Sequence, residues 1–389
     1  MTATASTKSQ DRIPLIDVIR GFAVFGIILV NAPSINSSIW NVAEFGFQIT
    51  AWDAFVSQFI MLFAAGKFYP IFSFLFGWGI MAFIESAERK QQNPAKLFIR
   101  RMNALLFLGL LNISLVWYGD VLLTYAIVGS VAFFFHTYSK QKLLSTIAWL
   151  FAILLIYHLY SAVIYLFEDF EYEEIDMQML YQTGTFVQIF WLRLQDYYDL
   201  YLWGFFDLEY IVSWTIYIVC YLLHMVSLFL LGIWTYKQRL FHDIDANWHM
   251  IKPIGISCLI FGLGSSSLSL HSAFFDVFLY PVSGISLGLG YIFLLISAYK
   301  YQLGKRLFSL LAYVGRMSLT NYMSSNIILT VLFYGYGFGL YGTMGAGSQL
   351  WITLAVCSVI ALFSYQWLQH FQRGPLESLW YKYTYAQQS

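Results

Sequence analysis

The chain has 389 residues, of which 59% are hydrophobic, 20% aromatic and 11% charged, and its mean hydropathy is +0.64. This composition excludes an ordinary soluble domain, and a formal net charge of zero leaves no basic excess for a nucleic-acid partner. The three cysteines lie in apolar runs without CxxC or metal-ligand spacing, so we interpret them as core residues and expect no metal site.

Apolar runs of transmembrane length recur along the whole chain. Because lipid offers backbone groups no hydrogen-bond partners, we predict an all-α fold, a polytopic transmembrane helical bundle in one integral membrane domain, 1–389. About ten spans are expected, at 17–35, 53–85, 97–116, 120–137, 143–167, 210–236, 251–269, 275–299, 307–333 and 350–371. The second run is too long for one straight crossing, so we expect it to divide at Gly66-Lys67 into 53–65 and 68–85.

The positive residues predict the orientation in the membrane. With both termini in the cytoplasm, 17 of the 21 Lys and Arg residues fall in inner segments, whereas Arg193 and Lys67 fall on the outer side. Pro33 directly follows the weak cleavage-like site at Val30-Asn31-Ala32, so we expect a retained first helix rather than a signal peptide.

The longest outer segment, 168–209, separates an N-terminal half at about 12–167 from a C-terminal half at about 210–385. It holds ten acidic residues and one base, Arg193. We interpret it as a solvated loop, with a funnel for a divalent cation or a cationic substrate as the alternative. The aromatic stretch 186–203 is typical of a helix lying in the membrane interface.

The first polar constellation is Asp17, Arg20 and Gly21. Residues i and i+3 share a helix face, so the Asp17 carboxylate can neutralise the Arg20 guanidinium at the cytoplasmic mouth, and Gly21 lets another backbone approach. Asn31 lies further along the same helix, about 15 Å above Gly21. The alternative is an ordinary membrane anchor with a helix cap.

Three further cations open or interrupt spans. Lys67, at the expected break, either snorkels to the outer headgroups or faces a cavity and holds an anion. Arg100 and Arg101 either anchor phosphate lipids or hold a nucleotide phosphate. Asp120, at an outer turn ahead of Tyr125, is either the cap of the next helix or a proton acceptor.

The strongest polar cluster is Arg316, Thr320 and Asn321, followed by Tyr322. These residues lie near one face of an expected span, where polar side chains usually face the bundle interior. The alternative is hydrogen bonding that holds helices together. After the last span, Gly374-Pro375 ends the helix and Glu377 is positioned to pair with an inner arginine. The intramembrane His158 and His224 adjoin none of these motifs and are interpreted as hydrogen-bonded packing residues, with a role as general base as the alternative.

Several of these motifs occur in the order seen in one known family. They are Arg12 with Leu15-Ile16-Asp17 and Arg20-Gly21, Leu29-Val30-Asn31, Lys67-Phe68 with Phe72–Gly77, Arg101 with Gly119-Asp120 and Tyr125-Ala126, Gly315–Tyr322, and Gly374–Glu377. From about Arg12 to Tyr385 the chain resembles the YeiB-type membrane protein family, whose C-terminal domain has no known function.

The Asp-x-x-Arg-Gly helix places that family beside the transmembrane acyltransferases, which move an acyl group from a cytoplasmic donor such as acyl-CoA to a sugar, lipid or polymer outside. The resemblance implies that Arg20, Arg100 and Arg101 hold donor phosphates. It also implies that Asp120, Lys67, Arg316 and Asn321 line a tunnel toward the acceptor. The expected location is the bacterial cytoplasmic (inner) membrane.

We therefore predict an integral-membrane acyltransferase acting on an envelope glycan, lipid or small metabolite, with acyl-CoA as donor substrate and no bound cofactor. The candidate catalytic residues are Asp120, Arg316 and Asn321. The candidate substrate-binding residues are Asp17, Arg20, Asn31, Lys67, Arg100, Arg101, Tyr125 and Tyr322.

The chain departs from the acyltransferase pattern at Asn31, where relatives with demonstrated acyl transfer tend to carry a histidine. An asparagine cannot serve as a general base, so Asp120 or a bundle histidine would have to replace it. This departure keeps two alternatives open: a transporter or exporter of a small polar or anionic substrate, and a non-catalytic scaffold. Whether the protein is an enzyme is therefore not decided by sequence.

Overall fold

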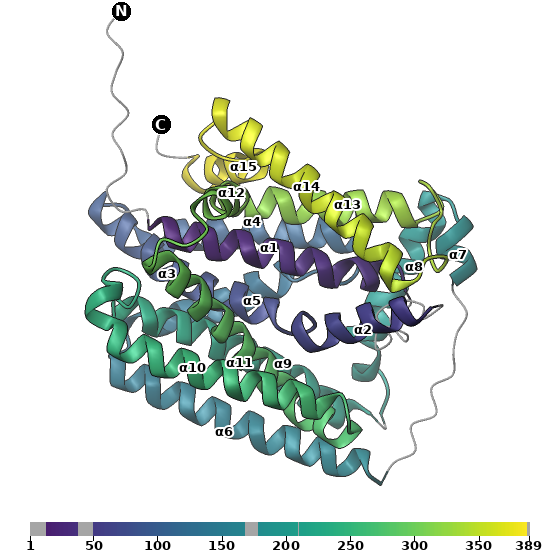
Figure 1. Cartoon of the computed structure of the whole chain (residues 1–389), viewed down its shortest axis with the longest axis horizontal. Helices are drawn as coiled ribbons and strands as arrows, with labels where there is room; N and C mark the ends of the chain where they lie inside the picture. Colours follow the sequence, from purple (N-terminus) through teal and green to yellow (C-terminus); the bar gives the residue numbers. More distant parts are fainter. Residues whose placement is uncertain (1–12, 38–49, 168–177, 209, 387–389) are drawn as a thin grey trace, which may run out of the picture.

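The computed structural model describes residues 13–37, 50–167, 178–208 and 210–386, and the regular elements of this part are all helices (Figure 1). They are α1 (Pro14–Ile35), α2 (Ala51–Phe63), α3 (Phe68–Arg89), α4 (Pro94–Leu115), α5 (Leu122–Phe133), η2 (Phe134–Thr137), α6 (Lys140–Tyr165), α7 (Gln178–Thr183), α8 (Phe186–Tyr201), η3 (Trp203–Phe205), α9 (Ile211–Lys237), α10 (Ile244–Ser269), α11 (Ala273–Lys300), α12 (Lys305–Arg316), α13 (Ser318–Phe333), α14 (Ala346–His370) and α15 (Pro375–Tyr385).

Eight helical segments of the described part are long and apolar enough to cross a membrane, which confirms a polytopic helical membrane protein. Of the ten runs predicted as spans, the one at 120–137 corresponds to a shorter apolar helix, Leu122–Thr137, and the one at 307–333 is interrupted. The number of ten spans and the side on which the termini lie stay predictions.

The helices form two flanks joined by α3. Figure 1 shows α6, α9, α10 and α11 side by side on one flank and α1, α12, α13 and α14 on the other. The helix α15 lies at the end where α1 begins, and α8 lies at the opposite end. The long helix α4 contacts both α15 and α8. We call these the α15 end and the α8 end.

The predicted division of the second apolar run is confirmed. The helix α2 ends at Phe63, a turn follows, and α3 begins at Phe68. Gly66 in this turn has a φ of 75°, a left-handed conformation that residues with a side chain rarely adopt. The backbone of α11 also approaches here, because a Cβ on Gly284 would lie 2.3 Å from the Gly66 carbonyl oxygen.

The run predicted as one span at 307–333 is divided at Met317 into α12 and α13, so the single-helix prediction was wrong there. Side chains satisfy the backbone N–H and C=O groups that the break leaves without partners inside a helix. Glu377 accepts hydrogen bonds from the backbone N–H groups of Leu319 (2.8 Å) and Thr320 (3.1 Å). The Asn321 side chain donates to the Val314 carbonyl oxygen at 3.0 Å. Such substitutes allow a helix break inside a membrane protein.

Two glycines bring α1 and α12 into backbone contact. A Cβ on Gly21 would lie 1.9 Å from the Leu311 carbonyl oxygen, and a Cβ on Gly315 would lie 1.9 Å from the Asp17 carbonyl oxygen. Small residues at a crossing allow membrane helices to approach this closely. Because Arg20 precedes one glycine and Arg316 follows the other, the crossing also brings the two arginines to one place.

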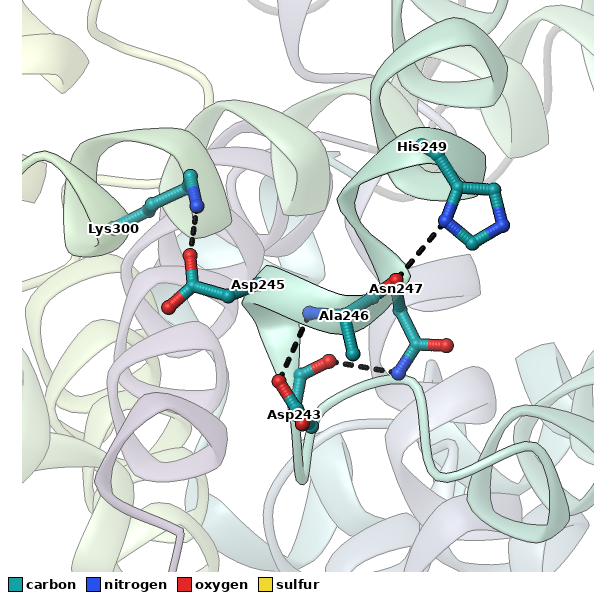
Figure 2. Close-up of polar contacts among 6 residues, drawn as sticks. All are labelled: Asp243, Asp245, Ala246, Asn247, His249 and Lys300. Carbon is teal, nitrogen blue, oxygen red and sulfur yellow. Dashed lines mark hydrogen bonds and ion pairs between the residues drawn. The ribbon is translucent and has the colours of Figure 1, made fainter.

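The hairpin of α10 and α11 is held at its polar end by the contacts in Figure 2. Asp243 accepts a hydrogen bond from the Ala246 N–H at 2.9 Å and thereby caps α10. Asp245, in the first turn of α10, pairs with Lys300 at the last turn of α11. A carboxylate near a helix N-terminus and an ammonium near a C-terminus both favour the helix dipoles.

At the opposite end, α8 begins with a capping box formed by Thr185 and Gln188. Its outward face is apolar, with Trp191 65% exposed, whereas Arg193 and Asp196 are buried beneath it. This face suits the interfacial helix predicted at 186–203, although residues 168–177 and Glu209 of the acidic segment lie outside the described part.

Candidate functional site

The described part contains a cavity of about 370 Å³ between α1, α3, α4, α5, α12, α13 and α15. It extends along α3 from Phe83 to Tyr69, which are about 21 Å apart by helical rise. Apolar side chains such as Phe72, Phe76 and Leu105 form most of the wall between. The cavity is therefore long and narrow and has two chemically different ends.

Four arginines line the cavity at the α15 end: Arg20, Arg101, Arg316 and Arg373. Glu377 is the single carboxylate among the lining side chains of the described part, and it is engaged by the start of α13. This end therefore carries an excess of positive charge. Guanidinium groups in such an arrangement suit the paired oxygens of phosphate or carboxylate.

Neighbouring groups orient these arginines. The Nη1 atom of Arg20 lies 3.2 Å from the Asp17 carboxylate, which confirms the pairing predicted within the first helix. Arg316 donates to the Gln372 carbonyl oxygen at 3.2 Å. The guanidinium carbons of two others lie over aromatic rings of α15, Arg101 at 3.8 Å from the Trp380 centroid and Arg373 at 3.6 Å from the Tyr381 centroid.

The end of the cavity opposite the four arginines is lined by the tyrosines Tyr69, Tyr125 and Tyr322. We call it the inner end, because it is the end away from α15. The Tyr125 hydroxyl donates to the Tyr69 carbonyl oxygen at 3.1 Å and lies 2.9 Å from the Ser73 hydroxyl. The Tyr69 hydroxyl is hydrogen-bonded to Nε2 of His224 at 3.0 Å. Because each hydroxyl is held by the protein, this end offers fixed polar groups inside an apolar wall.

Asp120 lies just behind this inner end, in the turn between α4 and α5, and is 6% exposed. It accepts hydrogen bonds from the Leu123 N–H (2.9 Å), the Asn112 side chain (2.8 Å) and the Tyr322 hydroxyl (3.4 Å). Burial raises the pKa of Asp120 to about 7, although the bonds from Leu123 and Asn112 oppose that rise. Asp120 therefore caps α5, as one interpretation predicted, and also has a proton affinity suited to a general base.

The structure brings some of the candidate residues together and separates others. Arg20, Arg101, Arg316, Tyr125 and Tyr322 line the cavity, while Asp17 and Asp120 contact lining residues. Four candidates do not line it: Asn31, Lys67, Arg100 and Asn321.

Three of these candidates have hydrogen bonds elsewhere in the bundle. Lys67 is 2% exposed and donates to the Met61 carbonyl oxygen at 2.8 Å. Asn31 donates to Asn326 at 3.2 Å, between α1 and α13. Asn321 donates to Val314 and to Ser364 of α14, so its bonds hold helices together, which was the alternative interpretation.

Two residues of the cavity and one residue bonded to its wall were not among the candidate site residues of the sequence analysis. Arg373 lies beyond the last span, Tyr69 is one of 29 tyrosines, and His224 lies far from the motifs in sequence. A signal existed for His224, because an ionisable residue within a span is by itself unusual. Glu377 was expected to pair with an arginine and instead caps α13.

Comparisons with known proteins find one family model and several relatives of similar length. Residues 235–387 match a family model described as protein of unknown function (DUF418). The chain is 29% identical to the uncharacterized protein YxaH of Bacillus subtilis (strain 168), covering 99% of this chain and 97% of the relative. It is 28% identical to an uncharacterized 39.9 kDa protein of Bacillus acidopullulyticus, over 97% and 94%. It is 26% identical to the uncharacterized protein YeiB of Escherichia coli (strain K12), over 96% and 97%. These descriptions carry no activity.

Proposed function

The chain belongs to the YeiB-type family of membrane proteins, and we propose that it is an integral-membrane acyltransferase. Its donor would be a phosphate-bearing acyl thioester such as acyl-CoA, and its acceptor a hydroxyl group of an envelope glycan, lipid or small metabolite. The observation that carries the proposal is one cavity with four arginines at one end and ordered tyrosine hydroxyls at the other.

The arginine end supports donor binding. A phosphate group in water is strongly hydrated, and only several charge-assisted hydrogen bonds can replace that hydration. Arg20 and Arg316 are fixed relative to each other by the glycine crossing, while Arg101 is fixed by Trp380, whose indole N–H donates to the Arg101 carbonyl oxygen at 2.9 Å. Preorganised donors of this kind bind an anion at a lower entropic cost.

The apolar wall supports an acyl arm. A thioester arm has little charge, so it gains free energy by leaving water for the surface of Phe72, Phe76 and Leu105. Binding in this direction places the phosphates among the arginines and the reactive carbonyl toward Tyr125 and Tyr322.

The chemistry then needs one proton acceptor. The acceptor oxygen attacks the thioester carbonyl carbon, its proton passes through the Tyr322 hydroxyl to the Asp120 carboxylate, and the carbon–sulfur bond breaks. Asp120 releases the proton to the departing thiolate, so the products are an ester and a free thiol. In this assignment Asp120 replaces the histidine that is missing at Asn31.

The same proposal gives the orientation. Most Lys and Arg residues lie in the segments that the charge bias assigns to the cytoplasm, and the arginine end of the cavity lies with them. The donor would therefore enter from the cytoplasm of a bacterial cell, with the protein in the cytoplasmic membrane and both termini inside.

The test uses purified protein in lipid nanodiscs, with binding of radiolabelled acyl-CoA and transfer of the label to membrane extracts as readouts. The matched variants are Arg101→Gln and Arg100→Gln, because these neighbours lie on the same helix and only Arg101 lines the cavity. We expect donor affinity to fall about 10- to 100-fold in Arg101→Gln, the loss of a charged hydrogen-bonding group, and to stay unchanged in Arg100→Gln. Equal loss in both variants, or no saturable binding, would overturn the proposal.

A transporter of small anions is the second candidate, because α8 packs against α4 and lies near Asp120 behind the cavity. Burial, and to a smaller extent the carboxylate of Asp120 behind the cavity, raises the pKa of Tyr197 and Tyr201 on α8. Movement of α8 would then open an outer exit. Sealed proteoliposomes distinguish the two functions, because a transporter moves a labelled anion across the membrane without forming an acylated product.

A further inference from the structure

A second cavity, of about 210 Å³, lies between α6, α9 and α11. Its lining comprises five apolar side chains, among them Leu154, Leu155 and Ile285, and two histidines, His158 and His224. The described lining holds no arginine, lysine or carboxylate. This cavity is therefore uncharged. It differs in this from the first cavity, which four arginines line and which we call the arginine cavity.

The rim of the second cavity reaches the outer surface of the bundle. Leu155 is 47% exposed, and its neighbour Ile156 is 69% exposed on the same helix. The helix α6 is a candidate membrane span with few buried residues, so this surface faces hydrocarbon. A molecule dissolved in the bilayer can therefore enter the cavity without crossing an aqueous phase.

The two histidines have unused hydrogen-bonding capacity. Within the part of the chain that the structure describes, His158 has no hydrogen-bond partner, and His224 is bonded through Nε2 to Tyr69, which leaves Nδ1. A polar group facing hydrocarbon without a partner is costly, so a ligand that bonds to it stabilises the protein. A neutral imidazole offers one donor and one acceptor, which matches a hydroxyl group.

His224 also connects the two cavities. Its ring lines the second cavity, and its bond to the Tyr69 hydroxyl reaches a residue that lines the arginine cavity. A hydroxyl group held at His224 would thus lie one side chain away from the inner end of the arginine cavity.

We propose that the cavity between α6, α9 and α11 binds a lipid alcohol, with its hydroxyl group hydrogen-bonded to His158 and His224 and its chain against the apolar wall. The absence of charged lining in the described part selects a neutral group, because a carboxylate or phosphate would be desolvated there without a counter-charge. This inference rests on the proposed function, because it identifies the acceptor of the acyl group as an alcohol dissolved in the membrane.

The experiment uses the full chain in phosphatidylcholine nanodiscs and two photoreactive probes. One is a long-chain alcohol with a mid-chain diazirine, and the other is its methyl ether, which cannot donate a hydrogen bond. Labelled peptides are identified by mass spectrometry, and unlabelled alcohol is added as competitor. We expect saturable labelling of the segments around Leu154 and Val282, with the alcohol preferred over the ether about three- to tenfold, the value of one or two hydrogen bonds.

The variants His158→Phe and His224→Phe should remove that preference while labelling by the ether persists. His158→Phe is the cleaner variant, because His158 does not touch the arginine cavity. Ile156→Phe, on the lipid-facing side of the same helix, is the matched control and should keep the preference. Thermal unfolding and size-exclusion profiles identify any variant that has not folded.

Labelling that does not saturate, that spreads evenly along α6, or that is equal for alcohol and ether would overturn the inference. The readout needs no acyl donor, so its failure is separate from failure of the proposed function. A site that binds the alcohol in a protein without acyl transfer would retain the binding inference and refute the enzyme.

Discussion

Arginines lie at both ends of the bundle, and those at the α15 end line the large cavity described above. At the α8 end, Arg193 is fully buried, donates to the Val116 carbonyl oxygen at 2.8 Å and lies over the Phe186 ring. At the α15 end, four arginines line open space. The same residue type therefore holds elements together in one region and lines a cavity in the other.

Two buried aspartates, Asp120 and Asp196, also differ in their access to that cavity. Asp196 accepts a hydrogen bond from Tyr181, and burial raises its pKa to about 6, close to the value for Asp120. However, the Tyr181 ring is enclosed by Tyr334 and Tyr341, with ring centroids 4.9 Å from each, whereas Tyr322 lines the cavity. A buried carboxylate with a raised pKa is thus a poor indicator of function by itself, and access to a cavity separates the two cases.

The largest effect is expected from replacing Asp120 by asparagine, compared with the same replacement at Asp196. Asp120→Asn keeps an oxygen that can cap α5 but cannot accept a proton, so acyl transfer should fall by about 10²- to 10⁴-fold, the range for loss of a general base. Asp196→Asn should leave the transfer rate per folded molecule unchanged. Equal losses in the two variants would remove the distinction drawn from cavity access.

The pH dependence should follow the pKa of Asp120. A base acts in its deprotonated form, and burial places that pKa at about 7, so the rate should rise with pH and level off above about 7. Below that value the rate should fall about tenfold per pH unit. The residual rate of Asp120→Asn should be flat over the same range, which is measured by single-turnover transfer in a series of buffers.

The glycine crossing at the α15 end is tested by Gly21→Ala. The new methyl group would lie 1.9 Å from the Leu311 carbonyl oxygen, so α1 and α12 must separate and displace Arg20 and Arg316. We expect a loss of about 1–3 kcal/mol in stability, typical of overpacking, with weaker donor binding. Gly264→Ala on α10 meets no atom within 4 Å and is the control, read by thermal unfolding and acyl-CoA titration.

The smallest effect on activity is expected from Arg193→Leu. Because Arg193 bonds to Val116 and lies outside the arginine cavity, its replacement should lower the free energy of unfolding by about 1–3 kcal/mol. Transfer per folded molecule and donor affinity should match the unchanged protein. A selective loss of donor affinity would show that the α8 end also takes part in binding.

Hydropathy and glycine pattern were enough to predict most of the fold. The helix break at Gly66 was predictable because a long apolar run with a glycine and a lysine in its middle cannot cross a bilayer straight. The break at Met317 was not, because the groups that satisfy it include Glu377, which is 58 residues beyond Leu319. Local sequence carries no signal of a cap supplied from so far away.

By itself, the sequence determined a helical membrane protein that resembles the YeiB-type family, and a short set of polar residues to examine. Only tertiary structure decided which of them share a cavity. Arg100 and Arg101, like Asn321 and Tyr322, are neighbours in the chain but point in directions about 100° apart on a helix, so one of each pair lines the cavity and the other does not. The close crossing at Gly21 and Gly315 decided that Arg20 and Arg316, almost 300 residues apart, lie together.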